Sequence, residues 1–504
     1  MKSNRSPQPS ARRKVRAPEE SKKQPTTSQL LVEIAEEWYR FGRTEQDRPF
    51  AVAINGSNVV LSMGGKGGRF GSRLAKLFYD QYRRPPNATA LADAQQVLIG
   101  RALDEKPEDV WLRTGRAPDG SIVLDLGDES GNAVVVTPDG WEVVDRSPVL
   151  FRRSALTIAW PEPISGGTLD ELSAFINTDD ATFDLLAAWI VSSYVPDIAH
   201  PVLLLSGEQG SVKSSACRAL VKMIDPTSAL LRKAPKDAES WSVAAAGSWG
   251  VALDNLSNIP EWLSDALCRA STGDADVRRK LYEDDGLFVE AFRRVVLLNG
   301  IEVGGVRGDL ADRMLLVECG RLDGKRKEET EVNAAFVAVW PELLGAALDL
   351  LALYLAAQRD STNRLRQLPR MADFARVVQA VDLELETTAL DSYYKQHKRV
   401  AIDVADDDVV TGPLRKVLSD NAGRFLGTAD ELLQAITNAC PGRTPNGWPN
   451  SAKILSSRLS RVAPGYREAG WVVEKRKSNS RKLWEIVLPG PDAPRTGSRI
   501  KAQR

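Results

Sequence analysis

Hydrophobic and polar positions divide the chain into stretches of different period. In residues 30–101 apolar side chains recur at helical spacing, as in LLVEIAEEWYRF, and predict helices. Between residues 110 and 160 the period falls to two and is broken by DG and GN turns, which predicts a small antiparallel β unit. Helices are predicted again over residues 169–194, and the apolar run LLL at 203–205 is typical of a buried strand.

A glycine-rich turn, GEQGSVKSS, separates that strand from a segment of helical period that begins at Lys213. A strand, a turn and a helix in this order place backbone N–H groups and a helix N-terminus around an anion. We expect Lys213 to reach the terminal phosphates and the Ser214 hydroxyl to ligate Mg²⁺, while Gly207 and Gly210 allow the bend. We prefer this nucleotide site, with ATP and Mg²⁺ as cofactors, to a purely structural loop.

The whole turn is expected to contact the nucleotide. Its residues are Gly207, Glu208, Gln209, Gly210, Ser211, Val212, Lys213, Ser214 and Ser215. Val212 stands where a P-loop has its last glycine, and a non-glycine residue costs about 1–2 kcal/mol if that position is left-handed.

Two more strands are predicted to end in polar residues close to this turn. The run VAL at 251–253 precedes Asp254, whose carboxylate is expected to hold Mg²⁺ together with Ser214; a turn after a buried strand is the alternative. Asn255 stands where many motors carry a glutamate, and an amide orients water but cannot accept a proton. The run RRVVLLN ends in Asn299, which we expect to sense the γ-phosphate or to position the attacking water.

Arg307 and Arg313 follow Asn299, near a polar turn ahead of another apolar run. An arginine supplied across a subunit boundary stabilises the charge of phosphoryl transfer and is worth about 10³ to 10⁵ in rate. Such a residue is called an arginine finger, and we expect Arg313 to be the finger here, with Arg307 as second choice. Each arginine taken alone is also typical of an ordinary ion pair.

Composition narrows the remaining classes of function. The formal net charge of the 504 residues is zero, so contact with nucleic acid must come from local patches. The four cysteines and two histidines lack metal-ligand spacing, which argues against a zinc site. No stretch is expected to approach the roughly 20 apolar residues of a membrane span, and we expect a cytoplasmic protein with no membrane partner.

Two basic segments are predicted to contact DNA. One precedes a hairpin with the acidic tip EDDG and is expected to grip single-stranded DNA, although its cations are equally suited to pair with that tip. The other is a C-terminal pair of helices followed by a basic β-ribbon, the pattern of a winged helix that places a helix in the major groove of duplex DNA. A partner-binding winged domain is the alternative. The expected DNA contacts are Arg278, Arg279, Lys280, Lys453, Arg458, Arg461, Lys475, Arg476, Lys477, Arg481 and Lys482.

The first helix of this C-terminal pair has a start signal. In GTADELLQAI, Thr428 is expected to be the N-cap, and Glu431 follows three residues later in capping-box order.

The order of GEQGSVKSS, VALDNLS, the hairpin before LLNG, and LADR resembles the ATPase core of phage- and plasmid-encoded primase-helicases. These proteins belong to superfamily 3 of the helicases, which are ring-forming AAA+ motors. The chain also resembles prophage ATP-binding proteins of actinobacteria, over residues 169–317. The resemblance implies phosphate and metal binding by Lys213, Ser214 and Asp254, a sensor role for Asn299 and a finger role for Arg313.

Val212 and Asn255 depart from the pattern of that family and leave the rate of hydrolysis open. We expect an α/β fold, with a P-loop AAA+ core built on a parallel sheet. The expected segments are disordered basic tails at 1–28 and 489–504, an α+β head at 29–168, the ATPase core at 169–325, a helical lid or collar at 326–410 and a winged-helix module at 411–488.

The expected function is an ATP-dependent DNA translocase or helicase of a phage or mobile-element replication system. It would act as a homo-oligomeric ring, a hexamer, with single-stranded DNA in the channel and duplex DNA on the C-terminal module. A primase or another replication protein is a further expected partner. The alternative is a nucleotide-gated DNA-binding initiator or regulator that hydrolyses ATP weakly or not at all.

Overall fold

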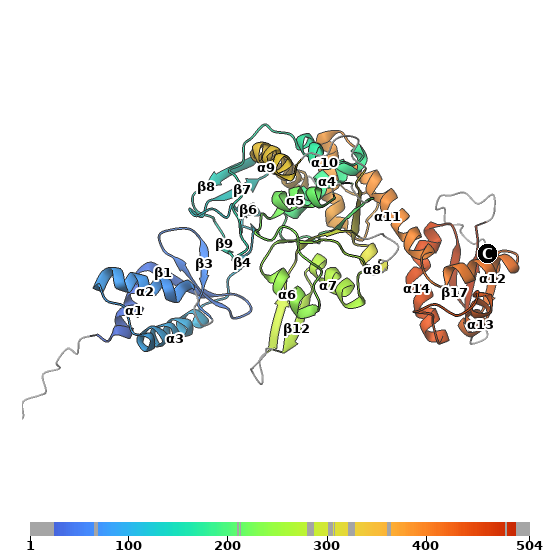
Figure 1. The fold of residues 1–504 in the computed structure, drawn as a ribbon, viewed down its shortest axis with the longest axis horizontal. Coiled ribbons are helices and arrows are strands. Elements are labelled where there is room, and N and C mark those ends of the chain that lie inside the picture. Colours follow the sequence, from blue (N-terminus) through green and yellow to red (C-terminus); the bar gives the residue numbers. More distant parts are fainter. Residues whose placement is uncertain are drawn as a thin grey trace, which may run out of the picture. The chain divides into compact units, whose positions relative to one another are not determined.

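The structure is a computed structural model, and it describes residues 25–64, 69–208, 211, 213–279, 287–300, 306, 308–320, 328–359, 364–478 and 481–489. The chain divides into two compact units (Figure 1). The first comprises residues 1–54 and 61–107, and the second comprises residues 55–60 and 108–504. This division falls inside the segment 29–168 that we expected to form one head.

The first unit combines helices with short strands. Its core is formed by apolar faces of the three helices, with Leu31, Phe70 and Leu98 fully buried. Our helical prediction ran through Phe41, but the first helix ends at Trp38 because Tyr39 and Phe41 pack edge-on against Phe70 from an antiparallel strand. The elements are α1 (Thr27–Trp38), β1 (Tyr39–Arg43), β2 (Pro49–Ala53), α2 (Arg69–Tyr82) and α3 (Ala88–Asp104), and the boundary with the second unit falls within β3 (Val59–Ser62).

The second unit begins with a β region that confirms the period-two prediction. Strands β5 to β8 form an antiparallel sheet in sequence order. β4, which precedes these strands in the chain, pairs in parallel with β9, which follows them. The strands are β4 (Val110–Trp111), β5 (Thr114–Arg116), β6 (Ile122–Asp125), β7 (Ala133–Thr137), β8 (Gly140–Val144) and β9 (Leu150–Arg152).

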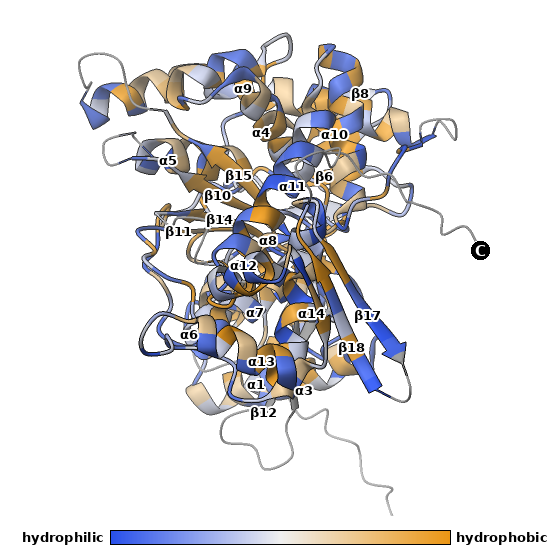
Figure 2. Cartoon of the chain, turned by 90° about the vertical axis from the view of Figure 1, so that its right-hand side faces the viewer, coloured by the Kyte–Doolittle hydropathy of each residue, from blue (hydrophilic) through white to orange (hydrophobic). Residues whose placement is uncertain are grey.

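A four-stranded parallel sheet forms the centre of the second unit, in the order β11-β14-β10-β15. Its strands are almost wholly buried and apolar, as expected for a sheet covered on both faces (Figure 2). The elements of this core are η1 (Leu169–Phe175), α4 (Asp180–Ser193), β10 (Val202–Ser206), α5 (Lys213–Ile224), α6 (Ala238–Ala246), β11 (Gly250–Leu253), α7 (Glu261–Thr272), β14 (Val295–Asn299), α8 (Gly308–Ala311) and β15 (Met314–Glu318).

The predicted hairpin is present between α7 and β14. β12 (Ala275–Arg279) pairs antiparallel with β13 (Leu287–Ala291), so the first strand begins earlier than the RKLY segment that we had assigned to it. Residues 280–286, which include Lys280 and the acidic tip, lie outside the described residues.

Three helices follow the core: α9 (Glu329–Arg359), α10 (Ala372–Leu385) and α11 (Ala389–Asp406). Among the described residues, α9 has the length and apolar composition of a membrane span, which contradicts our expectation that no stretch approaches one. In this structure 61% of its most apolar window is buried. Leu343, Leu348 and Leu351 lie in the main core, so the apolarity of α9 is explained by packing inside the protein.

Over its described residues, the C-terminal module has three helices and a three-stranded antiparallel sheet in the order β16-β18-β17. Figure 1 labels its three helices and β17. Thr428 and Glu431 form the capping box that the sequence predicts. The elements are α12 (Thr411–Asp420), β16 (Arg424–Gly427), α13 (Ala429–Ala439), α14 (Ala452–Glu468), β17 (Val472–Ser478) and β18 (Arg481–Val487).

Candidate functional site

The carboxyl ends of three parallel strands bring the predicted polar residues together. β10 leads directly into the glycine-rich turn, and Leu205 of β10 lies in register with Asn299, the last residue of β14. β11 ends at Leu253, in register with Leu298, so that Asp254 follows at the same edge of the sheet. Polar residues that were separated by up to 85 positions in the sequence therefore meet beside the turn.

Lys213 begins α5 and folds back over the turn. Its ammonium donates to the carbonyl oxygens of Gly207 at 2.6 Å and Glu208 at 2.8 Å, and to the Ser211 hydroxyl at 3.2 Å. All three acceptors are uncharged, so an anion, which forms stronger hydrogen bonds with an ammonium, can take their place. Gln209, Gly210 and Val212 lie outside the described residues.

Gly207 is required by the shape of the turn. Its φ of +142° is a conformation that residues with a side chain rarely adopt. A Cβ at this position would also collide with the carbonyl oxygen of Cys319, which follows β15. The glycine that the sequence predicted for bending is therefore needed for close approach of two backbone segments as well.

Asn299 connects the turn to the neighbouring strand end. Its side-chain nitrogen lies 2.5 Å from an Asp254 carboxylate oxygen and 3.3 Å from the Ser214 hydroxyl. Asn299 is 3% exposed, and its side-chain oxygen is buried with no hydrogen-bond partner among the described residues. A buried polar atom without a partner is costly, so this oxygen points to a group that completes the site.

These oxygens fit Mg²⁺. A hydroxyl and a carboxylate are hard ligands of the kind that Mg²⁺ prefers, and Mg²⁺ commonly takes one or two protein ligands together with phosphate oxygens and water. Ser214 and Asp254 both reach the same amide nitrogen of Asn299, so they face a common point. Among the described residues no cluster of three or more His, Cys, Asp and Glu side chains is present.

Asn255 is exposed and has a left-handed conformation, with φ of +54°. Asparagine tolerates this conformation better than most residues with a side chain. The next strand end comes close, because a Cβ on Gly300 would lie 3.1 Å from the Asn255 Cα. The turn after β11 is thus held against the turn after β14.

Cys319 lies at the carboxyl end of β15, beside the turn. Burial raises the pKa of its thiol to about 11, although the charge of Lys213 lowers it in part. The thiol therefore remains protonated at neutral pH, the form that is a poor nucleophile.

A pocket of about 400 Å³ adjoins the turn along α5. Ser215, Arg218 and Lys222 line it from α5, while Phe175 of η1 and Phe336 of α9 supply aromatic walls. The Lys222 ammonium lies 5.1 Å from the centre of the Phe336 ring, and burial, followed by the charge of Arg218, lowers the pKa of Lys222. The pocket therefore offers an apolar wall and aromatic edges next to the phosphate-type turn. Its two cations are partnered within the lining, Arg218 by Glu329 at 3.4 Å and Lys222 by the Asn333 side chain.

Arg313 lies at the opposite end of the sheet. Its backbone oxygen accepts from Val202, the first residue of β10, at 2.8 Å, whereas the glycine-rich turn follows the last residue of that strand. A five-residue strand is about 17 Å long, so Arg313 does not reach the turn of its own chain. Its guanidinium pairs with Asp309 at 2.9 Å and its side chain is 13% exposed.

The pairing with Arg313 affects Asp309. Burial raises the pKa of this carboxyl, but the hydrogen bond and charge of Arg313, together with the charge of Arg370, outweigh it and lower the pKa overall. Arg307, the second choice for a finger, lies outside the described residues.

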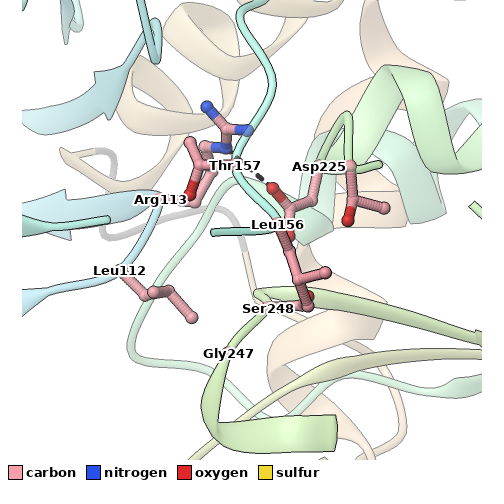
Figure 3. Close-up of a pocket in the computed structure, with 8 residues that line it drawn as sticks. Leu112, Arg113, Leu156, Thr157, Asp225, Gly247 and Ser248 are labelled. Atoms are coloured by element: carbon pink, nitrogen blue, oxygen red, sulfur yellow. Dashed lines mark hydrogen bonds and ion pairs between the residues drawn. The ribbon is translucent and has the colours of Figure 1, made fainter. Parts of the chain in front are cut away.

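One buried charge pair beside the core escaped the sequence analysis. Arg113, 1% exposed, donates to Asp225 at 2.8 Å (Figure 3). Its guanidinium also stacks over the Trp160 ring. The space among these residues is too small for a water molecule, so the pair is structural. Asp225 also accepts from the backbone of Trp249 at 2.7 Å, which ties the β region to the start of β11. No sequence signal marks a pair whose partners are 112 positions apart.

The predicted DNA contacts fall into three groups. Arg278 and Arg279 lie on β12, and Lys280 is outside the described residues. On α14, Lys453 and Arg461 are exposed, whereas Arg458 is held by Asp408 at 2.8 Å and by the Gly447 oxygen. Both strands of the ribbon β17–β18 carry exposed cations, and its outer end is strongly hydrophilic (Figure 2). These cations are Lys475, Arg476, Lys477, Arg481 and Lys482.

Two ribbon cations make contacts within the module. Lys475 donates to the Ser460 hydroxyl at 2.7 Å, and Arg476 forms an ion pair with the buried carboxylate of Glu485 at 2.5 Å. Lys477, Arg481 and Lys482 lie further out along the ribbon, where β17 and β18 pair residue by residue. All of the DNA contacts remain predictions.

Comparison with known protein families finds two matches, which follow one another along the chain. A family described as "Actinomycete integrative conjugative element replication protein" matches residues 169–408, the parallel-sheet core and the helices after it. The model described as "AICE RepA C-terminal domain" matches residues 410–498. Residues 169–408 and 410–498 thus match, one after the other, the two parts of a mobile-element replication protein.

Solved structures share only a general likeness with the chain. The apo NrS-1 C terminal region (305-718) is 13% identical, with a TM-score of 0.38 over 92% of this chain and all of its own. The A form of that region is 12% identical, with a TM-score of 0.40 over 91% of this chain and 99% of its own. A JCV helicase with a bound acetamide compound is 13% identical, with a TM-score of 0.21 over 47% of this chain and 70% of its own. No curated protein matches the sequence. With scores this low, the likenesses say nothing about the site.

Proposed function

We propose that this replication protein is an ATP-dependent DNA translocase or helicase with a P-loop ATPase core. The observation that carries the proposal is the meeting of Lys213, Ser214, Asp254 and Asn299 at the carboxyl ends of β10, β11 and β14. Open parallel sheets bind their ligands at this edge, and a helix N-terminus after a glycine-rich turn suits phosphate.

Each residue has a role in this proposal. Lys213 exchanges its contacts with the Gly207 and Glu208 oxygens for phosphate oxygens of ATP. Ser214 and Asp254 hold Mg²⁺, which supplies positive charge next to the phosphates. Asn299, fixed by its bond to Asp254, uses its unpartnered oxygen to orient the attacking water or to read the γ-phosphate.

The pocket along α5 is suited to the nucleoside of ATP. Ser215 lines the pocket and follows Ser214 directly on α5, so one ligand can occupy the turn and the pocket together. A volume of about 400 Å³ is within the usual range for small-molecule sites. The aromatic walls at Phe175 and Phe336 favour a flat, apolar base over a second phosphate group.

Arg313 would act on the site of a neighbouring subunit. It lies about a strand length from its own turn, and its guanidinium retains one buried N–H without a partner among the described residues. A finger supplied in this way requires a homo-oligomeric ring, which we propose to be a hexamer.

DNA would be engaged at two places. The hairpin β12–β13, next to β14 in the sequence, is proposed to contact single-stranded DNA in the ring channel. The C-terminal module has the helix–strand–helix–helix–ribbon order of a winged helix, and α14 with the ribbon β17–β18 is proposed to bind duplex DNA.

A second candidate is a nucleotide-gated DNA-binding initiator with weak hydrolysis. Asn255 favours it, because the residue after Asp254 is an amide that cannot take a proton from water. The two candidates share the nucleotide site and differ in whether DNA is moved.

Displacement of streptavidin from a biotinylated single strand tests movement directly. The wild-type chain with ATP and Mg²⁺ is expected to accelerate displacement, and Lys213→Ala is expected to abolish it. Lys236→Ala removes an exposed lysine outside the site and serves as the matched control. Tight DNA binding with no ATP-dependent displacement by the wild type would favour the initiator.

A further inference from the structure

The first unit, which lies outside both family matches, carries a strongly basic helix. Over residues 69–84, α2 and the two residues that follow contain five cations and one carboxylate. The cations are Arg69, Arg73, Lys76, Arg83 and Arg84, and all five are exposed. Among the described residues, Lys76 forms an ion pair with Asp80 at 3.0 Å, and the two side chains are 72% and 49% exposed. Such an exposed pair is weak, so most of the positive charge remains uncompensated.

Three of the cations share one face of the helix. Arg69, Arg73 and Lys76 are spaced by four and three residues, which keeps them in one row along α2. The row is about 11 Å long at 1.5 Å per residue. Arg83 and Arg84 follow the end of the helix. The opposite face buries Phe70, Leu74 and Phe78, each 0% exposed, so the basic face is held by the core of the unit.

Aromatic side chains flank this row. Tyr79 is 48% exposed and Tyr82 is 36% exposed, one helical turn apart. The Tyr82 ring lies 4.7 Å from the buried Phe78 ring, which braces it. Exposed tyrosines are available to stack on bases, a contact open to any unpaired base because each has a π face.

The charges of the unit are segregated by helix. Three acidic residues, Glu33, Glu36 and Glu37, are exposed on α1. In α2 the single acidic residue is Asp80. A solubilising surface mixes charges of both signs. The separation keeps the α2 face positive and favours an extended polyanion as the ligand.

We propose that the α2 face of the first unit binds single-stranded nucleic acid. Arg69, Arg73 and Lys76 contact successive phosphates, and Tyr79 and Tyr82 stack on bases. The site gives the protein a nucleic-acid contact separate from the hairpin and the C-terminal module.

Photocrosslinking on the full-length chain tests this surface. A p-benzoylphenylalanine at position 79 is expected to form an adduct with a labelled 30-nucleotide dT strand. The same residue at position 97 is the matched control, because Val97 is 49% exposed on α3 of the same unit. Adducts in equal yield at both positions, or at neither, would overturn the proposal, as would equal competition by duplex DNA of the same length.

The salt dependence of binding supplies the second readout. For the dT strand, the variant Arg69→Ala/Arg73→Ala/Lys76→Ala is expected to lose about 2 from the slope of log K against log salt, because each phosphate contact contributes about 0.7 in single strands. Circular dichroism verifies the fold of this variant, whose changed residues are all exposed. An unchanged slope in the folded variant would refute the phosphate contacts. Lys213→Ala leaves this binding intact, so failure here is distinct from failure of the ATPase proposal.

Discussion

At the scale of single residues, Lys213 is the centre of the proposed site. Its ammonium is held by two carbonyl oxygens and one hydroxyl, so it is positioned before any phosphate arrives. A charge-assisted hydrogen bond is worth about 1.5–3 kcal/mol. We therefore expect Lys213→Ala to weaken ATP binding by about 10-fold to 150-fold in calorimetry. Lys236→Ala should bind ATP as the wild type does, and an unchanged affinity in Lys213→Ala would place the phosphates elsewhere.

His200 leads to a prediction about pH. The ring is 1% exposed, and its centre lies 5.5 Å from the centre of the Trp249 ring in a T-shaped arrangement. Neither ring nitrogen has a hydrogen-bond partner among the described residues. Burial, and secondarily the charge of Arg293, lowers its pKa to about 3 from the usual 6.5.

The unfolded chain therefore takes up a proton at this histidine below pH 6.5, while the folded chain resists it. Stability is lost as the pH falls from about 6.5 towards 3, by up to about 1.4 kcal/mol per pH unit from this group. His200→Phe is expected to reduce the drop in the thermal unfolding midpoint between pH 7 and pH 5. An equal drop in the wild type and the variant would show that other groups control this range.

At the scale of elements, the ribbon and α14 differ in how freely their cations can meet DNA. Lys477, Arg481 and Lys482 lie on the outer part of β17–β18, whereas Arg458 of α14 is bound to Asp408. We expect the triple change of Lys477, Arg481 and Lys482 to Ala to weaken duplex binding and to lower the salt slope by about 3, with little effect on unfolding. Arg458→Ala should instead destabilise the module by leaving the Asp408 carboxylate unpaired.

Thermal unfolding and fluorescence anisotropy at several salt concentrations, applied to both variants, separate these effects. A triple variant with wild-type affinity and slope would remove the ribbon from the DNA interface.

Elements with strong local signals could be predicted from the sequence. The strand–turn–helix around Lys213, the antiparallel β region and the capping box at Thr428 follow from residues close together in the chain. Contacts between distant residues escaped prediction. Nothing in the local pattern indicates that Tyr39 leaves α1 to pack on Phe70, or that Asp408 neutralises Arg458.

The same distinction applies to the candidate site. Asp254 and Asn299 were predicted as strand ends, since parallel strands align their carboxyl ends. Their hydrogen bond and the unpartnered Asn299 oxygen depend on side-chain packing that the sequence does not reveal. For α9 the composition alone is misleading, because it is that of a membrane span. The fold shows that most of its apolar window is buried inside the protein.

At the scale of the whole molecule, the position of Arg313 predicts sites shared between subunits. A chain with Lys213→Ala retains Arg313, and a chain with Arg313→Ala retains Lys213. Mixing the two inactive variants should restore part of the ATPase activity, because some interfaces then combine both wild-type residues. Light scattering verifies that the variants assemble. Mixtures that assemble and remain inactive would contradict a finger acting between subunits.

The central claim is that the strand ends around Lys213 form an ATP site that works on DNA. The most direct measurement is the rate of ATP hydrolysis by the wild-type chain with Mg²⁺, with and without single-stranded DNA. The account predicts that DNA raises the rate several-fold and that Lys213→Ala abolishes hydrolysis in both conditions. A wild-type rate that is zero, or that does not change with any DNA, would contradict it.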